Sequence, residues 1–145
     1  MKIKWLGQSG YILSDEKTVI CIDPYLSDCV NRIANRPRLK DVPINPQDLK
    51  ADAVICTHNH VDHVDIDAIP LMDKDIAFYA PTDCKDTLAQ LGVTKYMPFD
   101  EGMAYNIGDF KISAVFADHT VPAVGVIIEY GGDHKNHMKN KGLKF

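Results

Sequence analysis

The chain has 145 residues, of which 46% are hydrophobic and 25% charged, values of an ordinary globular domain that can bury a core without disulfides or a structural metal. Its formal net charge of −4 argues against a nucleic-acid or membrane-surface binder, because such proteins use a basic face. A small anionic substrate stays compatible with this charge, since a bound metal ion reverses the charge of its own pocket.

No stretch of the sequence has the pattern of a targeting or membrane-spanning segment. The first seven residues lack a long apolar core, and no apolar run approaches the length of a membrane span. The cysteines are widely spaced, without a C-x-x-C pair, which favours reduced thiols in a core over a disulfide framework: Cys21, Cys29, Cys56 and Cys84. We therefore expect a cytoplasmic protein.

Short antiparallel strands are predicted over the N-terminal third of the chain. Residues 2–6, 11–13 and 18–22 alternate polar and apolar positions or are rich in β-branched residues, with turn residues between them. The third strand should end at Asp23-Pro24, because proline stops ladder pairing.

A long surface loop is predicted over residues 25–46, with one helical turn near 28–33. Its cations are interleaved with prolines, and no periodicity survives: Arg32, Arg36, Arg38 and Lys40. Long loops in compact domains often form lids or binding segments, so these cations could help to hold an anionic substrate. A plain solvated loop explains the same composition equally well.

The remaining elements alternate between strands and helices. A helix over 82–91 should have Thr82 as its N-cap and Gly92 as its end, and Pro70 should limit a shorter helix over 65–72. Strands are expected at 52–56, 76–80, 95–97, 110–116 and 124–130. The pattern predicts a layered α/β (α+β) fold of residues 1–132, mostly antiparallel sheet with helices on one face. The Lys-, Asn- and His-rich residues 133–145 are predicted to form a disordered tail.

Metal-binding side chains gather directly after the buried strand at 52–56. His58, His60, Asp62 and His63 lie within six consecutive positions, and imidazole and carboxylate are ligands for Zn²⁺ and similar divalent ions. In a turn that leaves a strand, the two alternate histidines can reach one ion, while Asp62 and His63 turn toward a second position. His119 also follows a predicted strand and would supply the third imidazole of the first position.

The heptapeptide Thr57-His58-Asn59-His60-Val61-Asp62-His63 resembles the T-H-x-H-x-D-H signature of the metallo-β-lactamase superfamily. The segments Trp5-Leu6-Gly7-Gln8-Ser9-Gly10-Tyr11 and Cys21-Ile22-Asp23-Pro24 look like the opening of its branch that includes the L-ascorbate-6-phosphate lactonase. The likeness runs from residue 2 to about residue 132.

This resemblance implies an αββα sandwich with two metal ions at one edge. His58, His60 and His119 would bind the first ion, and Asp62 and His63 the second. Asp23 would support the motif loop by hydrogen bonding, although a strand-end turn residue is an equal interpretation. Metal-assisted hydrolysis would follow, with Asp62 orienting the attacking water or accepting its proton.

The sequence departs from the family after residue 130, where a G-D-[ST] segment is expected. Asp133 is followed by His134, and neither His134 nor His137 is a convincing replacement ligand. We therefore expect only the N-terminal half of the sandwich, a fragment or a chain completed by another, without the second sheet and its helices. An exposed apolar sheet face would then favour a homo-oligomer.

The cofactor is expected to be Zn²⁺ or Mn²⁺, with Fe²⁺ also compatible, and one tight site is predicted in this chain against two in the family. The substrate would be a small lactone or phosphorylated ester, with Arg32, Arg36 or Arg38 as phosphate partners. The alternative is a non-catalytic metal-binding remnant. A structural zinc module fits less well, because no cysteine lies beside the histidines.

Overall fold

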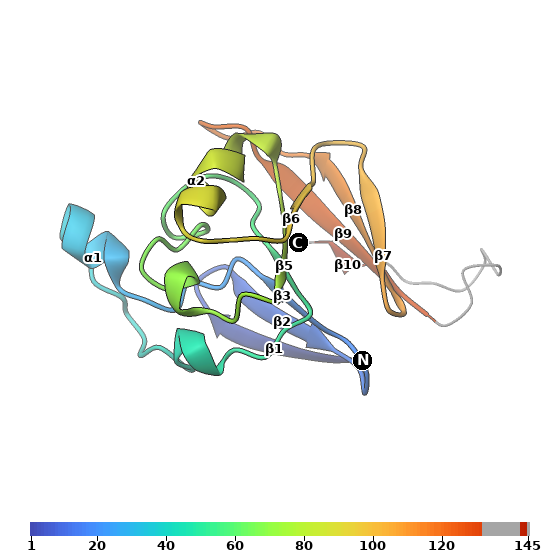
Figure 1. Ribbon diagram of the computed structural model, residues 1–145, viewed down its shortest axis with the longest axis horizontal. Helices are drawn as coiled ribbons and strands as arrows, with labels where there is room; N and C mark the ends of the chain where they lie inside the picture. The colour runs from blue at the N-terminus through green and yellow to red at the C-terminus, as the bar shows by residue number, and fades with distance from the viewer. Residues whose placement is uncertain (132–142, 145) are drawn as a thin grey trace.

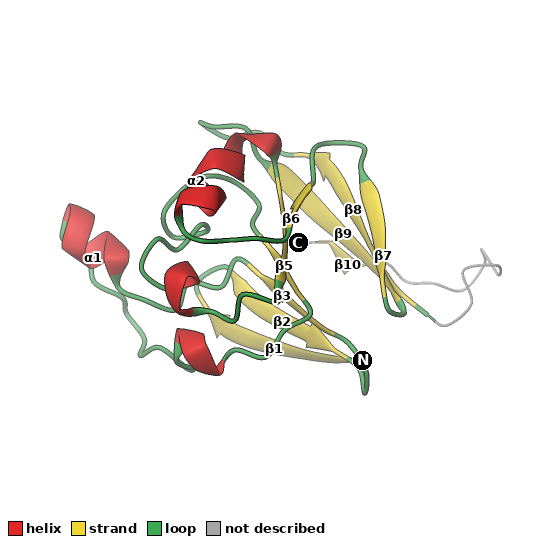
Figure 2. Cartoon of the chain, viewed as in Figure 1, coloured by secondary structure: helices red, strands yellow, loops and turns green. Residues whose placement is uncertain are grey.

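Two β-sheets lie face to face, and helices cover the other side of the first sheet (Figures 1 and 2). The structure, a computed structural model, describes residues 1–131 and 143–144. The first sheet contains, in spatial order, β1 (Lys2–Gly7), β2 (Gly10–Ser14), β3 (Val19–Ile22), β4 (Ala53–Ile55), β5 (Ala77–Ala80) and β6 (Tyr96–Pro98). The second contains β10 (Leu143–Lys144), β9 (Val124–Tyr130), β8 (Phe110–Phe116) and β7 (Ala104–Ile107). The helices are α1 (Cys29–Ala34) and α2 (Lys85–Gln90), with 3-10 turns η1 (Pro46–Asp48), η2 (Ile69–Leu71) and η3 (Thr82–Cys84).

The first sheet is antiparallel in one half and parallel in the other. Strands β1, β2 and β3 form the predicted antiparallel meander, whereas β3 to β6 pair in parallel. Parallel neighbours need long crossovers, and these connections carry the helices to one face. Because the second sheet pairs in antiparallel register throughout its described part, the prediction of a mixed fold dominated by mostly antiparallel sheet, with helices on one face, is confirmed.

Apolar clusters cover both faces of the first sheet over its middle strands, β3 to β5. On the helix side, Cys21, Val54 and Phe78 pack with Ile69 of η2 and Leu88 of α2. On the other side the first sheet contacts the second in one buried cluster, whose members include Leu13, Ile20, Ile55, Phe110, Ile112, Val126 and Ile128. The expectation that the second sheet is absent is therefore wrong, and so is the exposed apolar face inferred from it.

Strand β7 escaped prediction because it is short and contains Asn106, a poor strand former. Gly102 and Gly108, which bracket it, both have positive φ. Glycine at such positions marks tight turns, so this pair was the available signal.

Two predicted helices differ in detail. The segment 65–72 contains only the 3-10 turn η2, because Pro70 lacks an N–H and the Asp65 carboxylate takes the N–H groups of residues 67 and 68. The helix over 82–91 begins with η3 before α2, and Thr82 is not its N-cap. The Thr82 hydroxyl instead donates to Asp100, 2.6 Å away. Gly92 follows the helix with a φ of 86°, as expected of a C-terminal glycine.

The outer face of the second sheet carries alternate residues of β8 and β9, with an ion pair between Lys111 and Glu129 at 3.1 Å. In the described part of the chain, no helix combines the length and hydropathy needed to cross a bilayer. The predicted tail 133–145, with His134 and His137, lies outside the described residues except for 143–144, which pair with β9.

Candidate metal centre

The histidine motif begins where strand β4 ends, and the parallel pairing of β3 with β4 puts Asp23 beside it. Carboxyl ends of parallel strands meet at one edge of a sheet. The backbone N–H of Asp23 donates to the carbonyl of Ile55 at 2.8 Å, which extends the pairing by one step. Residues 34 positions apart in the sequence, Asp23 and Thr57, are thereby brought into contact.

His119 reaches the motif because the β8–β9 connection lies against it. The N–H of Val124 donates to the carbonyl of Thr57 at 3.0 Å, and Ala123 forms an isolated antiparallel bridge with His58. These two contacts join the start of β9 to the motif loop. The loop from Ala117 to Pro122 therefore projects over the carboxyl end of β4 with His119 directed inward.

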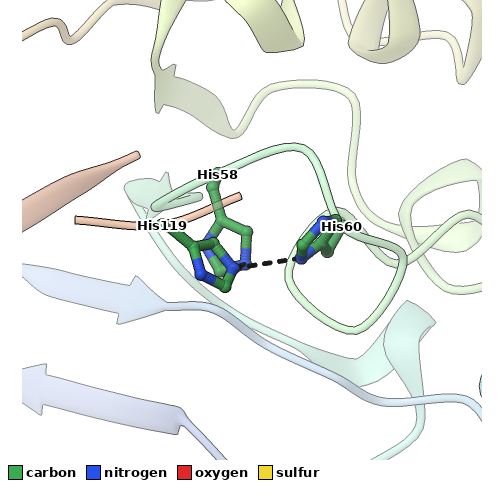
Figure 3. Close-up of side chains that lie close together, drawn as sticks. All are labelled: His58, His60 and His119. Atoms are coloured by element: carbon green, nitrogen blue, oxygen red, sulfur yellow. Dashed lines mark hydrogen bonds between the residues drawn. The ribbon is translucent and has the colours of Figure 1, made fainter. Parts of the chain in front are cut away.

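Three imidazoles converge on one point (Figure 3). The Nε2 atom of His119 lies 3.1 Å from Nε2 of His58 and 3.2 Å from Nδ1 of His60. The three donor atoms lie within 4.8 Å of one another. Two nitrogens bound to one tetrahedral Zn²⁺ at about 2.0–2.1 Å stand roughly 3.3 Å apart, so the two spacings from His119 match those of a shared divalent ion. Three imidazole ligands, with the fourth position left to water or substrate, are the ligand set of a catalytic zinc site.

A chain of hydrogen bonds orients the first imidazole. The Oγ1 atom of Thr57 lies 2.8 Å from Asp23 Oδ2, to which it donates, and 2.9 Å from Nδ1 of His58. Because Thr57 Oγ1 gives its own proton to Asp23, it accepts the proton on Nδ1 of His58. This leaves Nε2 of His58 without a proton and free to face the cluster. Asp23 also accepts the N–H of Thr57 at 2.8 Å. It is 3% exposed and has a φ of 42°, an uncommon conformation for a residue other than glycine.

Burial, reinforced by the positive charge of the nearby His63, lowers the pKa of His58 to about 4. Only 7% of His58 is exposed. Since a metal ligand must be deprotonated, His58 is ready to coordinate a metal at neutral pH.

A second ion position would involve Asp62 and His63. Nδ1 of His63 lies 2.8 Å from Asp23 Oδ2, and its Nε2 lies 3.6 Å from Asp62 Oδ2. Burial lowers the pKa of His63, but the hydrogen bond and charge of Asp23 outweigh it and leave the pKa raised. His63 therefore holds its proton more firmly than His58.

The three candidate arginines have different surroundings. Arg32 pairs with Asp67, with N···O distances of 2.5 and 3.1 Å. Arg38 donates to the carbonyls of Tyr25, Ser27 and Lys40. Arg36 lines a pocket of about 600 Å³ together with Arg38 and Asp62, whereas Arg32 does not.

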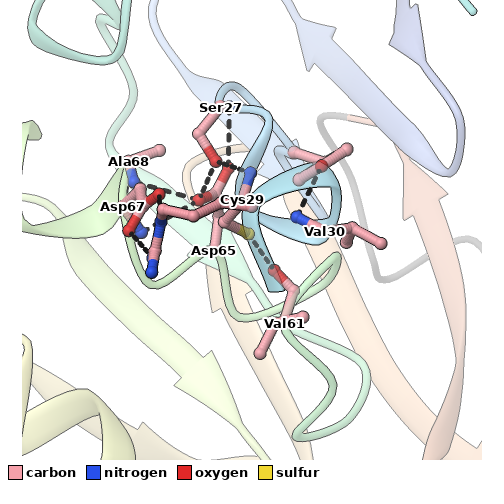
Figure 4. Close-up of polar contacts among 9 residues, drawn as sticks. Ser27, Cys29, Val30, Val61, Asp65, Asp67 and Ala68 are labelled. Carbon is pink, nitrogen blue, oxygen red and sulfur yellow. Dashed lines mark hydrogen bonds and ion pairs between the residues drawn. The ribbon is translucent and has the colours of Figure 1, made fainter. Parts of the chain in front are cut away.

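A buried carboxylate that the sequence reasoning missed, that of Asp65, braces the motif loop (Figure 4). Asp65 is 0% exposed and accepts the hydroxyl of Ser27 at 2.6 Å and the N–H groups of residues 26, 27, 67 and 68. The Cys29 thiol donates to the carbonyl of Val61, 3.3 Å away. Thr57 was also missed as a hydrogen-bonding partner. An aspartate two positions after the motif, at the start of a predicted helix, was the available signal for Asp65.

Comparison with known proteins gives a match over residues 18–138 to the Beta-lactamase superfamily domain. A UPF0173 metal-dependent hydrolase of Archaeoglobus fulgidus is 31% identical over 123 residues, covering 85% of this chain and 46% of that protein. A UPF0173 protein of Pyrococcus furiosus is 29% identical over 133 residues, covering 89% of this chain and 55% of the relative. This chain spans about half the length of these curated relatives.

Among solved structures, a possible metal-dependent hydrolase from Veillonella parvula superimposes with a TM-score of 0.76 at 20% identity, covering 98% of this chain and 60% of that one. At this identity the likeness concerns the fold. It extends over both sheets, because nearly the whole chain is covered.

Proposed function

Because this chain belongs to the β-lactamase superfamily, we propose that it is a metal-dependent hydrolase. The observation that carries the proposal is the convergence of His58, His60 and His119 on one point. Imidazoles that lie this close together without a carboxylate between them have little favourable interaction energy unless they bind a shared cation. Zn²⁺ or Mn²⁺ suits these ligands, and Fe²⁺ is compatible.

A divalent ion held there would supply Lewis-acid activation of water and of the scissile bond. The chain's own groups would do the rest. Asp62 lines the adjoining pocket with a side chain that is 34% exposed, so its carboxylate can accept a proton from an attacking water. Thr57 and Asp23 hold His58 in the tautomer that coordinates.

The substrate class that we propose is a small lactone or phosphorylated ester. Two considerations support it: the resemblance of the motifs to the L-ascorbate-6-phosphate lactonase branch, and the cationic group of Arg36 in the pocket beside Asp62. Guanidinium groups bind phosphate through charge-assisted hydrogen bonds.

The test is hydrolysis of a panel of lactones and phosphorylated esters by the Zn²⁺- and Mn²⁺-loaded chain. For a substrate that is turned over, Asp62→Asn should lower kcat by about 10²–10⁴-fold, the range for loss of a general base. Asp67→Asn, which removes an exposed carboxylate away from the site, should not. Equal activity of Asp62→Asn and the wild type would contradict this role, and no turnover of any panel member would contradict the substrate class.

A second candidate function is that of a metal-binding protein without catalytic activity of its own. It is favoured by the second ion position, to which the motif assigns only Asp62 and His63. One ion bound per chain, together with absence of turnover, would support it. Turnover that appears on adding a partner chain would support a half-domain completed in trans.

Two further expectations stay proposals. Self-association of the chain into a homo-oligomer is the first, and gel filtration tests it. A cytoplasmic location is supported by four cysteines that are all free and buried, since thiols persist in reducing compartments.

A further inference from the structure

The pocket beside Asp62 has the composition of a ligand site with two distinct halves. It is bounded by the β1–β2 turn and by the loop that follows α1. Its volume is about 600 Å³, which is ample for a small organic molecule. Asp62 is the motif residue that lines it, so a ligand held there lies next to the candidate metal centre.

The first half is an apolar wall made by Trp5, Tyr25 and Leu39. Trp5 is 55% exposed and Leu39 is 96% exposed. The indole N–H of Trp5 donates to the carbonyl of Gln8 at 2.9 Å, which holds the ring at the pocket edge. Large apolar side chains left open to solvent at the rim of a pocket are typical of ligand contact.

The second half is cationic, but its three cations are not equivalent. The Arg38 side chain stabilises the fold: its guanidinium donates to three backbone carbonyls and lies over the Tyr25 ring, 4.7 Å from the centroid. This contact fixes the loop against the apolar wall. The side chains of Arg36 and Lys40 have no ion pair or hydrogen bond to the described residues, so their charges are available to a ligand.

A second hollow, which adjoins His119, has the other sign of charge, because it is lined by Asp100, Glu101 and Asp118. An anion would be repelled there and attracted to the side of Arg36. The charges therefore favour one direction for a ligand that crosses the centre.

We propose that the pocket binds small amphipathic anions, with the acidic group at Arg36 and Lys40 and an apolar portion against Trp5 and Tyr25. The inference deepens the proposed function and rests on it, because the bond to be cleaved would then lie toward Asp62. It makes Arg36 and Lys40 the residues that select the substrate and leaves Arg38 as a positioning residue.

Trp5 provides a direct readout, since it is the only tryptophan of the chain. The experiment titrates the full chain at low ionic strength with hexyl phosphate, hexanoate, hexanol and inorganic phosphate while tryptophan emission is recorded. We expect hexyl phosphate and hexanoate to change the emission saturably. Hexanol and inorganic phosphate should bind at least about tenfold more weakly, because each engages only one half of the pocket.

Matched variants assign the anion to its partners. Arg36→Gln should weaken binding of hexyl phosphate about five- to tenfold, the loss expected for one exposed charge-assisted contact, and adding Lys40→Gln should weaken it further. Lys85→Gln, which removes one exposed cation from α2, should leave it unchanged. Wild-type affinity in Arg36→Gln, equal binding of hexanol, or an emission that does not respond to hexyl phosphate would each overturn the proposal.

The titration is repeated after metal removal and with His119→Ala. Binding that persists with its dependence on Arg36 supports the pocket even if no substrate is ever turned over, so failure of the proposed hydrolase function is distinguishable from failure of this inference. Binding that disappears with the metal would place the anion on the ion and overturn the role of Arg36.

Discussion

The Nε2 atoms of His58 and His119 lie 3.1 Å apart, although 61 positions separate the two residues in the sequence. One imidazole follows a strand of the first sheet and the other follows a strand of the second. An ion shared between them would therefore join the two sheets. Because metal binding to a site formed only on folding stabilises the folded state, metal affinity and stability should change together.

Metal titration of His119→Ala is the first test of this link. We expect the wild type to bind one Zn²⁺ tightly per chain. Loss of a direct ligand should weaken binding by more than the roughly 10–100-fold that loss of an outer hydrogen-bonding partner costs. Calorimetric titration with Zn²⁺ measures both the stoichiometry and the affinity.

Asp118→Ala serves as its control, since this neighbouring residue is exposed and is not among the converging donors. Zn²⁺ at a concentration that just saturates the wild type should raise the Tm of the wild type and of Asp118→Ala, and should raise that of His119→Ala much less. Two tight ions in the wild type, or undiminished affinity in His119→Ala, would argue against the centre as described.

Asp23→Asn should impair the centre without removing any of its three converging imidazoles. The carboxylate accepts from Thr57 twice and from His63 once, and an amide can replace only part of this set. We expect Zn²⁺ affinity to fall about 10–100-fold and the free energy of unfolding to fall by about 1–3 kcal/mol. Asp52→Asn, another aspartate that accepts a backbone N–H, should leave Zn²⁺ affinity unchanged.

The residues that the sequence could identify are those with a local pattern. The motif at 57–63 and the strand that precedes it are contiguous, and their period and composition suffice to predict a site there. His119 was inferred only because it also follows a strand. Its distance from His58 depends on how β8 and β9 lie against the motif loop, which is a property of the packed sheets.

What could not be predicted depends on contacts between distant segments. The parallel pairing of β3 with β4 leaves no periodic signal in such short strands. Arg38 differs from Arg36 because its guanidinium donates to the carbonyl groups of residues 25, 27 and 40. The missing G-D-[ST] segment predicts that the second sheet is absent, yet three of its four strands, β7, β8 and β9, precede that point in the chain.

The metal-free chain should lose stability on acidification partly through His58. Its pKa is lowered to about 4 by burial and by the charge of His63, against about 6.5 when unfolded. Between these values the unfolded chain binds the proton and the folded chain does not, so stability is lost as pH falls from about 6.5 to about 4. His63, whose pKa is raised, acts in the opposite sense, and its contribution is lost as pH rises.

Thermal unfolding of the metal-free wild type and of His58→Asn across pH 4–7 measures this effect. The decline in Tm toward low pH should be shallower in His58→Asn. Titration of the carboxylates affects both proteins equally. Parallel declines in the two proteins would contradict the lowered pKa of His58.

Removing the Asp65 carboxylate should cost far more stability than removing its exposed neighbour Asp67. In Asp65→Ala, backbone N–H groups of the two segments it joins and the Ser27 hydroxyl lose their acceptor. A buried donor without a partner costs about 1–3 kcal/mol, so several together should lower the free energy of unfolding by about 3 kcal/mol or more. Asp67→Ala loses an exposed ion pair with Arg32, a change of at most about 1 kcal/mol. Urea unfolding of the metal-free proteins with reductant compares them, and similar losses in both variants would show that Asp65 does not brace the motif loop.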